Sequence, residues 1–315
     1  MRITHGLHPC LTHASAVTAG NFDGVHLGHQ AMLSRLSAYA RQHGLESVAV
    51  TFEPHPREWF GGDDIPARLS SLRDKLTVMR SCGIDHVHIC TFNQELASMP
   101  AETFVRQILL QGLGMRHLLI GDDFRFGHRR SGDFALLRQL GEQQQYSVEA
   151  MTSVLCDAER VSSTTLREAL AAGDLVRAHR LAGRPFSISG HVVHGDKRGR
   201  QLGFPTANLN LNRRKLPVSG VFAVYIHGLG DTPLAGVANV GMRPTLQNDL
   251  QPRLETHILD FHGHLYGKIV AVTFLAKLRD EQKFPDLDAL RNQIGLDIQQ
   301  AKSCFDRLSS ELSYG

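Results

Sequence analysis

The sequence contains little of what marks secreted, membrane-spanning or nucleic-acid-binding proteins. Its five cysteines form no C-x-x-C pair, which argues against a disulfide framework and a zinc site and fits a reducing compartment. No apolar run approaches the ~20 residues that span a bilayer, and the N-terminus has no signal-peptide core. The formal net charge of +3 is too small to indicate nucleic acid. We therefore expect a cytoplasmic protein with no membrane or nucleic-acid partner; its oligomeric state is left open.

Hydrophobic patterning changes near residue 184 and predicts two domains, for which 315 residues are sufficient. In the first half, buried-strand runs at 47–52, 86–90 and 117–121 alternate with helical runs, which is typical of a parallel sheet covered by helices on both faces. One of these helical runs, at 100–110, predicts a helix with Phe104, Val105, Ile108 and Leu109 facing inward. In the second half, short β-like runs separated by Gly, Pro and Asn predict an antiparallel barrel, followed by a helix at 287–308. We expect an α/β Rossmann-like domain over residues 1–184 and a small antiparallel β-barrel domain over residues 185–315.

The most informative stretch is Gly20-Asn21-Phe22-Asp23-Gly24-Val25-His26-Leu27-Gly28-His29. It follows a buried-strand run and opens a helix, so His26 and His29 lie on one face of the first helical turn. That turn carries unpaired backbone N–H groups and the positive end of the helix dipole, and Gly28 leaves room for close approach. The pattern predicts a site that binds a nucleoside triphosphate and cleaves it between the α and β phosphates.

Three further segments are predicted to join this loop, because each follows a strand end or opens a helix. They are Thr-Phe-Glu-Pro-His-Pro at 51–56, Gly-Asp-Asp-Phe-Arg-Phe-Gly at 121–127 and Val-Ser-Ser-Thr-Thr-Leu-Arg at 161–167. Arg167 can bind phosphate through its forked guanidinium. Asn21, Phe52 and Asp122 follow strand ends, so we expect them to line one crevice. If the acceptor is itself a phosphate, alignment and positive charge suffice and no strong base is needed.

Each of these patterns also has a purely structural interpretation. His-x-Gly-His alone fits a turn with surface histidines, the Ser-Ser-Thr run fits an ordinary helix cap, and Gly-Asp-Asp-Phe fits a strand-end turn. Their joint occurrence at strand and helix ends of one α/β half favours the functional interpretation.

Together the four segments resemble the adenylyltransferase half of the bacterial bifunctional riboflavin kinase/FAD synthetase family, with a nucleotidyltransferase fold. The resemblance implies that FMN and ATP condense to FAD and pyrophosphate, with His26 and His29 at the ATP phosphates as catalytic residues. It implies an ATP site formed by Gly20, Asn21, Phe22, Asp23, His26, Gly28, His29, Ser162, Ser163, Thr164 and Arg167. It implies a flavin site formed by Phe52, Pro54, His55, Pro56, Asp123 and Phe124.

The strongest signal in the second half is the basic, glycine-rich stretch at 195–208, which ends in Gly-Phe-Pro-Thr-Ala-Asn. Its glycines and cations suit phosphate, although the loop equally fits a solvated turn or a weak nucleic-acid patch. Thr206 and Asn208 lie two residues apart on a strand and point to one face, and their oxygens suit Mg²⁺. A hydroxyl acceptor must lose a proton, which favours a carboxylate base. Glu255 is the candidate, although a Glu in a β-like run is often just solvent-facing.

This half resembles the riboflavin kinase domain, a small closed β-barrel, through Gly-Phe-Pro-Thr-Ala-Asn and the runs at 220–223, 239–245 and 265–267. The resemblance implies Mg²⁺ at Thr206 and Asn208, and Glu255 as the base that activates the ribityl 5′-hydroxyl of riboflavin. It implies that Glu255 and Arg279 face the flavin. It implies an ATP site formed by Gly195, Lys197, Arg200, Gly203, Pro205, Thr206 and Asn208.

We expect a bifunctional enzyme that phosphorylates riboflavin to FMN and adenylylates FMN to FAD, using ATP and Mg²⁺. One rival interpretation is a nucleotidyltransferase with another acceptor, such as a nicotinate or pantetheine phosphate; the Pro-Thr-Ala-Asn half argues against it. Another is a nucleic-acid-binding protein, which the small net charge does not favour. In a third interpretation, one half has lost its activity and only binds flavin. The intact motif residues in both halves argue against it.

Overall fold

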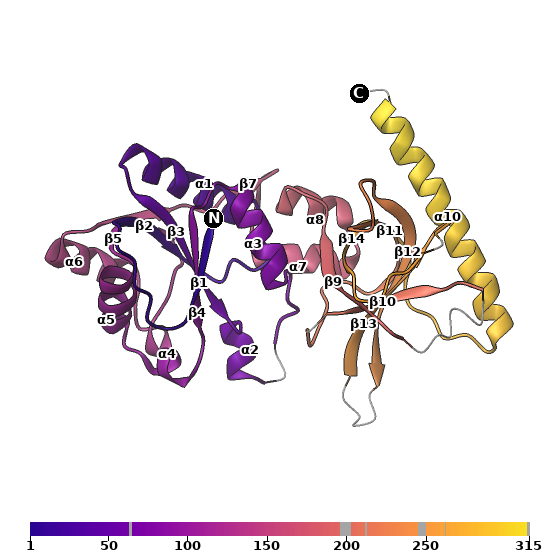
Figure 1. Ribbon diagram of the computed structural model, residues 1–315, viewed down its shortest axis with the longest axis horizontal. Helices are drawn as coiled ribbons and strands as arrows, with labels where there is room; N and C mark the ends of the chain where they lie inside the picture. Colours follow the sequence, from indigo (N-terminus) through magenta and orange to yellow (C-terminus); the bar gives the residue numbers. More distant parts are fainter. Residues whose placement is uncertain (63–64, 196–202, 212, 245–249, 262, 314–315) are drawn as a thin grey trace. The chain divides into compact units, whose positions relative to one another are not determined.

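The computed structural model describes residues 1–62, 65–195, 203–211, 213–244, 250–261 and 263–313 (Figure 1). Contacts within the chain divide it into two units. The first unit comprises Met1–Pro66 and Leu72–Ser162, and the second comprises Ala67–Ser71 and Ser163–Gly315. In this division, residues 163–184 belong to the second unit. The domain boundary expected at residue 184 stays a prediction.

The first unit is built on a six-stranded sheet in the order β1-β4-β3-β2-β5-β6. Every neighbouring pair of strands runs parallel. The strands are β1 (Arg2–His5), β2 (Ser15–Ala19), β3 (Glu46–Glu53), β4 (His86–Thr91), β5 (Met115–Gly121) and β6 (Ser147–Met151). The carboxyl ends of the central strands therefore meet at one edge of the sheet, where α/β proteins bind ligands.

Helices cover both faces of this sheet (Figure 1). One face packs its apolar side chains against α1 (Leu27–Gln42) and α3 (Leu72–Ser81). The other packs against α4 (Gln94–Ser98), α5 (Ala101–Thr103), η1 (Phe104–Gly112) and α6 (Phe134–Gln144). The remaining short elements are α2 (Pro56–Phe60), η2 (His128–Arg130), β7 (Leu155–Cys156) and β8 (Glu159–Arg160). Along β2, β3 and β5, successive side chains alternate between the two cores, as a sheet buried on both sides requires.

The helix expected at 100–110 is present but differs in winding. It begins as α5 and continues as η1, a nine-residue π-helix. The residues predicted to face inward are all buried, namely Phe104, Val105, Ile108 and Leu109. A Cβ on Gly112 would lie 2.7 Å from the Pro9 side chain, so a glycine is required where this helix ends.

The edge strand β1 could not be predicted from the sequence, because its residues are mostly polar and all are exposed. It pairs with β4 in register. The Thr4 hydroxyl lies 2.7 Å from His86 Nε2 and 2.9 Å from His88 Nδ1. Both histidine rings are buried, and burial lowers the pKa of His88 to about 4, helped by the nearby His86.

The second unit contains a closed antiparallel barrel in the order β10-β13-β12-β11-β14-β9. Its strands are β9 (Ser187–Val193), β10 (Thr206–Asn210), β11 (Gly220–His227), β12 (Leu234–Pro244), β13 (Leu250–Ile258) and β14 (Ile269–Arg279). Two helices precede it, α7 (Ser163–Ala172) and α8 (Leu175–Ala182), and α8 contacts β14. The barrel and the terminal helix confirm the predicted fold.

The long helix α10 (Leu287–Ser313) packs against the outside of the barrel on β11, β12 and β14. Ala301 and Phe305 from this helix are buried against Val221 and Ala223 of β11. None of the helices among the described residues combines the length and apolar content needed to cross a bilayer.

Candidate active sites

The loop between β2 and α1 holds its two histidines in a fixed arrangement. His26 is the N-cap of α1, and its Nδ1 accepts a hydrogen bond of 3.3 Å from the backbone N–H of His29. The two imidazole rings stack with centroids 3.7 Å apart. A Cβ on Gly28 would lie 3.2 Å from the His26 ring, so the glycine permits this packing. The predicted adjacency of the histidines on the first helical turn is thus present.

The loop has an unusual backbone, held by burial. Phe22 and Val25 have φ angles of +48° and +38° and are almost completely buried. A positive φ is rare for a bulky or β-branched residue and persists only where surrounding structure over-determines it. The Phe22 ring lies edge-on to His29, with centroids 5.2 Å apart. Phe22 therefore supports the histidines from within the core, and Asp23 beside it is buried too.

Lys75 of α3 is a buried cation beneath this loop that sequence reasoning missed. Its Nζ donates to the Asn21 carbonyl at 2.7 Å and to Thr51 Oγ1 at 3.1 Å. These bonds tie the loop after β2 to the neighbouring strand β3. A lysine in a polar helical run is expected on the surface, so the sequence alone does not predict that Lys75 is buried and holds this loop.

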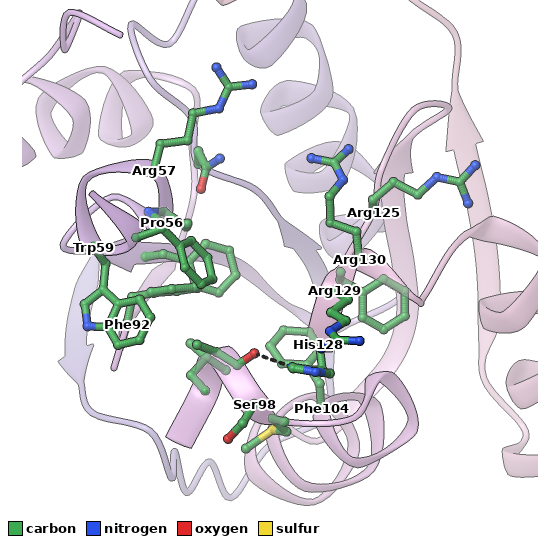
Figure 2. Close-up of a pocket in the computed structure, with 18 of the residues that line it drawn as sticks. Pro56, Arg57, Trp59, Phe92, Ser98, Phe104, Arg125, His128, Arg129 and Arg130 are labelled. Atoms are coloured by element: carbon green, nitrogen blue, oxygen red, sulfur yellow. Dashed lines mark hydrogen bonds between the residues drawn. The ribbon is translucent and has the colours of Figure 1, made fainter. Parts of the chain in front are cut away.

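Next to the histidine loop lies a cavity of about 720 Å³ (Figure 2). Its wall is largely aromatic: the rings are Phe52, Trp59, Phe60, Phe92, Phe104, Phe124 and Phe126. Arginines line it as well, from α2, from the segment after β5 and from η2. A planar aromatic ligand that carries negative charge would suit such a lining.

Several residues predicted from the sequence line this cavity together: Gly20, Asn21, Phe52, Pro56, Asp123 and Phe124. Asn21 and Phe52 thus share one crevice as expected, whereas Asp123 lines it in place of the expected Asp122. Pro54 and His55 are not among its lining residues. His55 is instead the N-cap of α2, where its Nδ1 accepts from the Arg57 backbone N–H at 3.2 Å.

The predicted hydroxyl-rich helix opening is α7, which begins at Ser163. Thr164 is exposed and Ser162 and Ser163 are partly exposed. Arg167 is engaged with backbone carbonyls: its Nε donates to Ala67 at 2.7 Å and its terminal nitrogen to Ser163 at 3.1 Å. The role of these four residues at ATP stays a prediction.

In the barrel, Asn208 of β10 and Glu255 of β13 are cross-strand partners, and Glu255 also pairs with Asn239 of β12. Their neighbours Ala207, Leu254 and Thr256 are buried, so by alternation Asn208, Glu255 and Asn239 share the outer face. Thr206 lies on the same face two residues before Asn208. The predicted metal ligands and the predicted base therefore meet on one surface.

Arg253 links this row and was not singled out from the sequence. It lies 2.5 Å from Glu255 Oε1 and donates to Asn208 Oδ1 at 3.1 and 3.2 Å. The signal for it is the i, i+2 spacing of Arg253, Glu255 and His257 along one strand face. One guanidinium thus holds both the candidate base and a candidate metal ligand.

The glycine-rich stretch is described at its two ends only. A Cβ on Gly195 would overlap the Asn208 amide, so the backbone there packs directly on that side chain. Gly203 has a φ of +90°, and the Pro205 carbonyl lies 2.9 Å from His257 Nδ1. Lys197 and Arg200 lie outside the described residues.

Arg279, expected near the flavin, makes two 2.8 Å hydrogen bonds to the buried Asp297 of α10. Its guanidinium also lies over the Phe284 ring at 5.6 Å. Burial raises the pKa of the nearby Glu281, whose carboxylate packs against Gly241. Arg279 thus anchors the terminal helix, and its contact with flavin stays a prediction.

Comparisons with known proteins agree with this division. Residues 9–165 match the FAD synthetase family and residues 182–305 match the riboflavin kinase family. A bifunctional riboflavin kinase/FMN adenylyltransferase of Pseudomonas fluorescens is 48% identical over 305 residues, covering 96% of this chain and 97% of its own. The protein of that name from Escherichia coli K12 is 44% identical over 306 residues, covering 97% of each chain.

A solved structure supports the same fold along nearly the whole chain. It is a crystal structure described as a macrolide-efflux protein from Streptococcus pneumoniae, 27% identical, with a TM-score of 0.80. The match covers 96% of this chain and 99% of that one. Together with the two family matches and the full-length relatives, this shows that the chain belongs to the bifunctional riboflavin kinase/FMN adenylyltransferase family.

Proposed function

We propose that the chain converts riboflavin to FMN at the outer face of β10, β13 and β12, and FMN to FAD at the histidine loop and the aromatic cavity. The observation that carries the second assignment is that Gly20 and Asn21 belong to both features. They line the cavity and begin the loop that leads to His26. A flavin in the cavity is thereby adjacent to a triphosphate at the first turn of α1.

In the adenylyl transfer, an oxygen of the FMN phosphate attacks the α-phosphorus of ATP. The bond from that phosphorus to the oxygen bridging the β-phosphate breaks, and pyrophosphate leaves with the bonding pair. The nucleophile is already anionic, so the protein supplies alignment and positive charge rather than a base. The α1 N-terminus, His26 and His29 supply these at the phosphates, and Gly28 allows close approach. The flavin ring packs against the aromatic wall, with Phe52 and Phe124 from the predicted set.

In the kinase reaction, the ribityl 5′-hydroxyl attacks the γ-phosphorus of ATP and ADP leaves. The hydroxyl proton passes to the Glu255 carboxylate, which Arg253 positions by a direct ion pair. The Thr206 hydroxyl and the Asn208 carbonyl oxygen fit Mg²⁺, which prefers one or two protein oxygens together with substrate phosphates and would neutralise charge on those phosphates. Among the described residues, no cluster of His, Cys, Asp and Glu offers a metal site of another kind.

We assign residues 1–184 to adenylyl transfer and 185–315 to the kinase, and place the protein in the cytoplasm. Its partners are then the small molecules ATP, riboflavin and FMN.

Position-labelled ATP tests the assignment. Riboflavin supplied with γ-labelled ATP should yield labelled FMN, and unlabelled FMN supplied with α-labelled ATP should yield labelled FAD. Label from the γ position should appear in pyrophosphate during the second step. The division into two reactions would be wrong if FAD carried no label from the α position. It would also be wrong if the γ phosphate of ATP were not the group transferred to riboflavin.

A further inference from the structure

Two consecutive arginines in the aromatic cavity are held in an unfavourable backbone conformation. Arg129 and Arg130, in the turn η2, have φ angles of +52° and +60°. The left-handed region is unfavourable for residues other than glycine, and asparagine is among those that tolerate it best. Both arginines line the cavity.

The turn is fixed by its surroundings on both sides. Phe126 and Gly132 exchange backbone hydrogen bonds of 3.2 and 2.9 Å, which closes the loop between them. A Cβ on Gly127 would lie 2.6 Å from the Ala101 backbone, so the loop lies directly on the start of α5. The backbone N–H of His128 donates to the Met99 carbonyl at 2.8 Å. The left-handed conformation is thus imposed by the fold and does not depend on the arginine side chains.

The charges around the cavity are unevenly paired. Arg125 forms an ion pair of 2.8 Å with Asp133, and Asp123 forms one of 3.0 Å with Arg160. Within the described residues, the guanidinium groups of Arg129 and Arg130 have no carboxylate partner, and both side chains are exposed. Figure 2 shows the Arg130 side chain extending away from the aromatic rings, on the side of the cavity opposite Arg57. The cavity therefore combines an aromatic wall with uncompensated positive charge.

We propose that Arg129 and Arg130 form the anion-binding part of this cavity and select a flavin that carries a phosphate over one that does not. The proposal rests on the cavity being the flavin site of the adenylyl-transfer step. Guanidinium groups bind phosphate oxygens through charge-assisted hydrogen bonds, while an uncharged flavin gains nothing from them. Residues kept at a strained backbone position, with side chains that fulfil no structural pairing, are typical of binding sites.

The test uses Arg129→Asn, Arg130→Asn and the double variant of the full chain, because asparagine preserves the left-handed turn. The KM for FMN in FAD formation should rise about threefold in each single variant and at least tenfold in the double variant. The inhibition constant of lumiflavin, which has the ring system without the ribityl phosphate, should change less than twofold. The KM for ATP and the rate of riboflavin phosphorylation should not change. Arg138→Gln, an exposed arginine of α6 that does not line the cavity, is the matched control.

The thermal midpoint of the Asn variants should equal or exceed that of the unsubstituted chain, since backbone strain is relieved. An unchanged KM for FMN would overturn the proposal, as would an equal weakening of lumiflavin, which would indicate damage to the ring site. A raised KM for ATP alone would assign the arginines to the nucleotide instead. If the unsubstituted chain made no FAD from FMN, the proposed function itself would fail, before any variant is compared.

Discussion

The two proposed active sites are assembled by different means. In the adenylyltransferase unit, the site is set by the backbone: a loop with positive φ at Phe22 and Val25 places two stacked histidines at a helix N-terminus. In the barrel, the site is set by strand register, which brings Asn208 and Glu255 into line while Arg253 links their side chains. A site fixed by the backbone should depend on a few small or buried residues, whereas a site fixed by register should depend on side-chain pairing.

The largest expected effect is the loss of the base in the barrel. Glu255→Ala should lower the kcat of FMN formation about 10²–10⁴-fold, because Glu255 is the carboxylate that, among the described residues of that strand face, is placed to accept the hydroxyl proton. FAD formation from supplied FMN should survive, as measured by separate assays of the two products. Asp231→Asn, at an exposed position between β11 and β12, is the control. Loss of both activities in a folded Glu255 variant would contradict the separation of the two sites.

His29→Ala should have the converse effect. Removing an imidazole from the phosphate site is expected to reduce FAD formation on the order of 10²–10³-fold, by the loss of transition-state stabilisation. FMN formation from riboflavin should continue at its usual rate. His43→Ala, at the opposite end of the same helix α1, should alter neither rate by more than about twofold. An unaffected FAD rate in the His29 variant would remove the histidine loop from the mechanism.

Arg253 tests whether side-chain pairing governs the barrel site. Arg253→Ala leaves the Glu255 carboxylate and the Asn208 oxygen without their shared donor, and should lower the kcat for FMN formation on the order of 10²-fold. Arg253→Lys keeps the charge without the forked geometry and should recover only part of that loss. Full activity of the Ala variant would show that register alone positions Glu255. FAD formation provides the internal control.

Acid should destabilise the adenylyltransferase unit through its buried histidines. Burial lowers the pKa of both His88 and His117 to about 4, below the ordinary value of about 6.5. The unfolded chain therefore binds protons first, and the stability held above pH 6.5 is lost as the pH falls toward 4. His88 alone should account for roughly 1–2 kcal/mol of unfolding free energy between pH 7 and pH 5. His88→Gln should flatten that dependence in denaturant titrations; an unchanged slope would contradict the assignment.

The strands and helices with a regular spacing of apolar residues could be predicted from the sequence, because those apolar residues are the ones that become buried. The strands at 47–52, 86–90 and 117–121 and the inward face of η1 all lie where the pattern puts them. The edge strand β1 and the helix α3 were missed, since one is exposed and the other carries the buried Lys75 in a polar sequence.

The candidate sites follow the same rule. Motif positions such as His26, Phe52 and Glu255 could be named from the chain, because their chemistry is visible in the residue type. Arg253 and the turn at Arg129 could not, since their significance depends on a cross-strand contact and on backbone angles. Lys197 and Arg200 lie outside the described residues, and their role in binding ATP stays a prediction.

The guanidinium of Arg253 is shared between two groups that would serve different substrates. A nucleotide complex that takes up the Asn208 oxygen would release donors of Arg253 for Glu255, and so change how that carboxylate meets the flavin hydroxyl. If bound ATP changes the affinity for riboflavin in this way, bound riboflavin must change the affinity for ATP by the same factor. The shared guanidinium therefore predicts that the two substrates of the barrel bind interdependently.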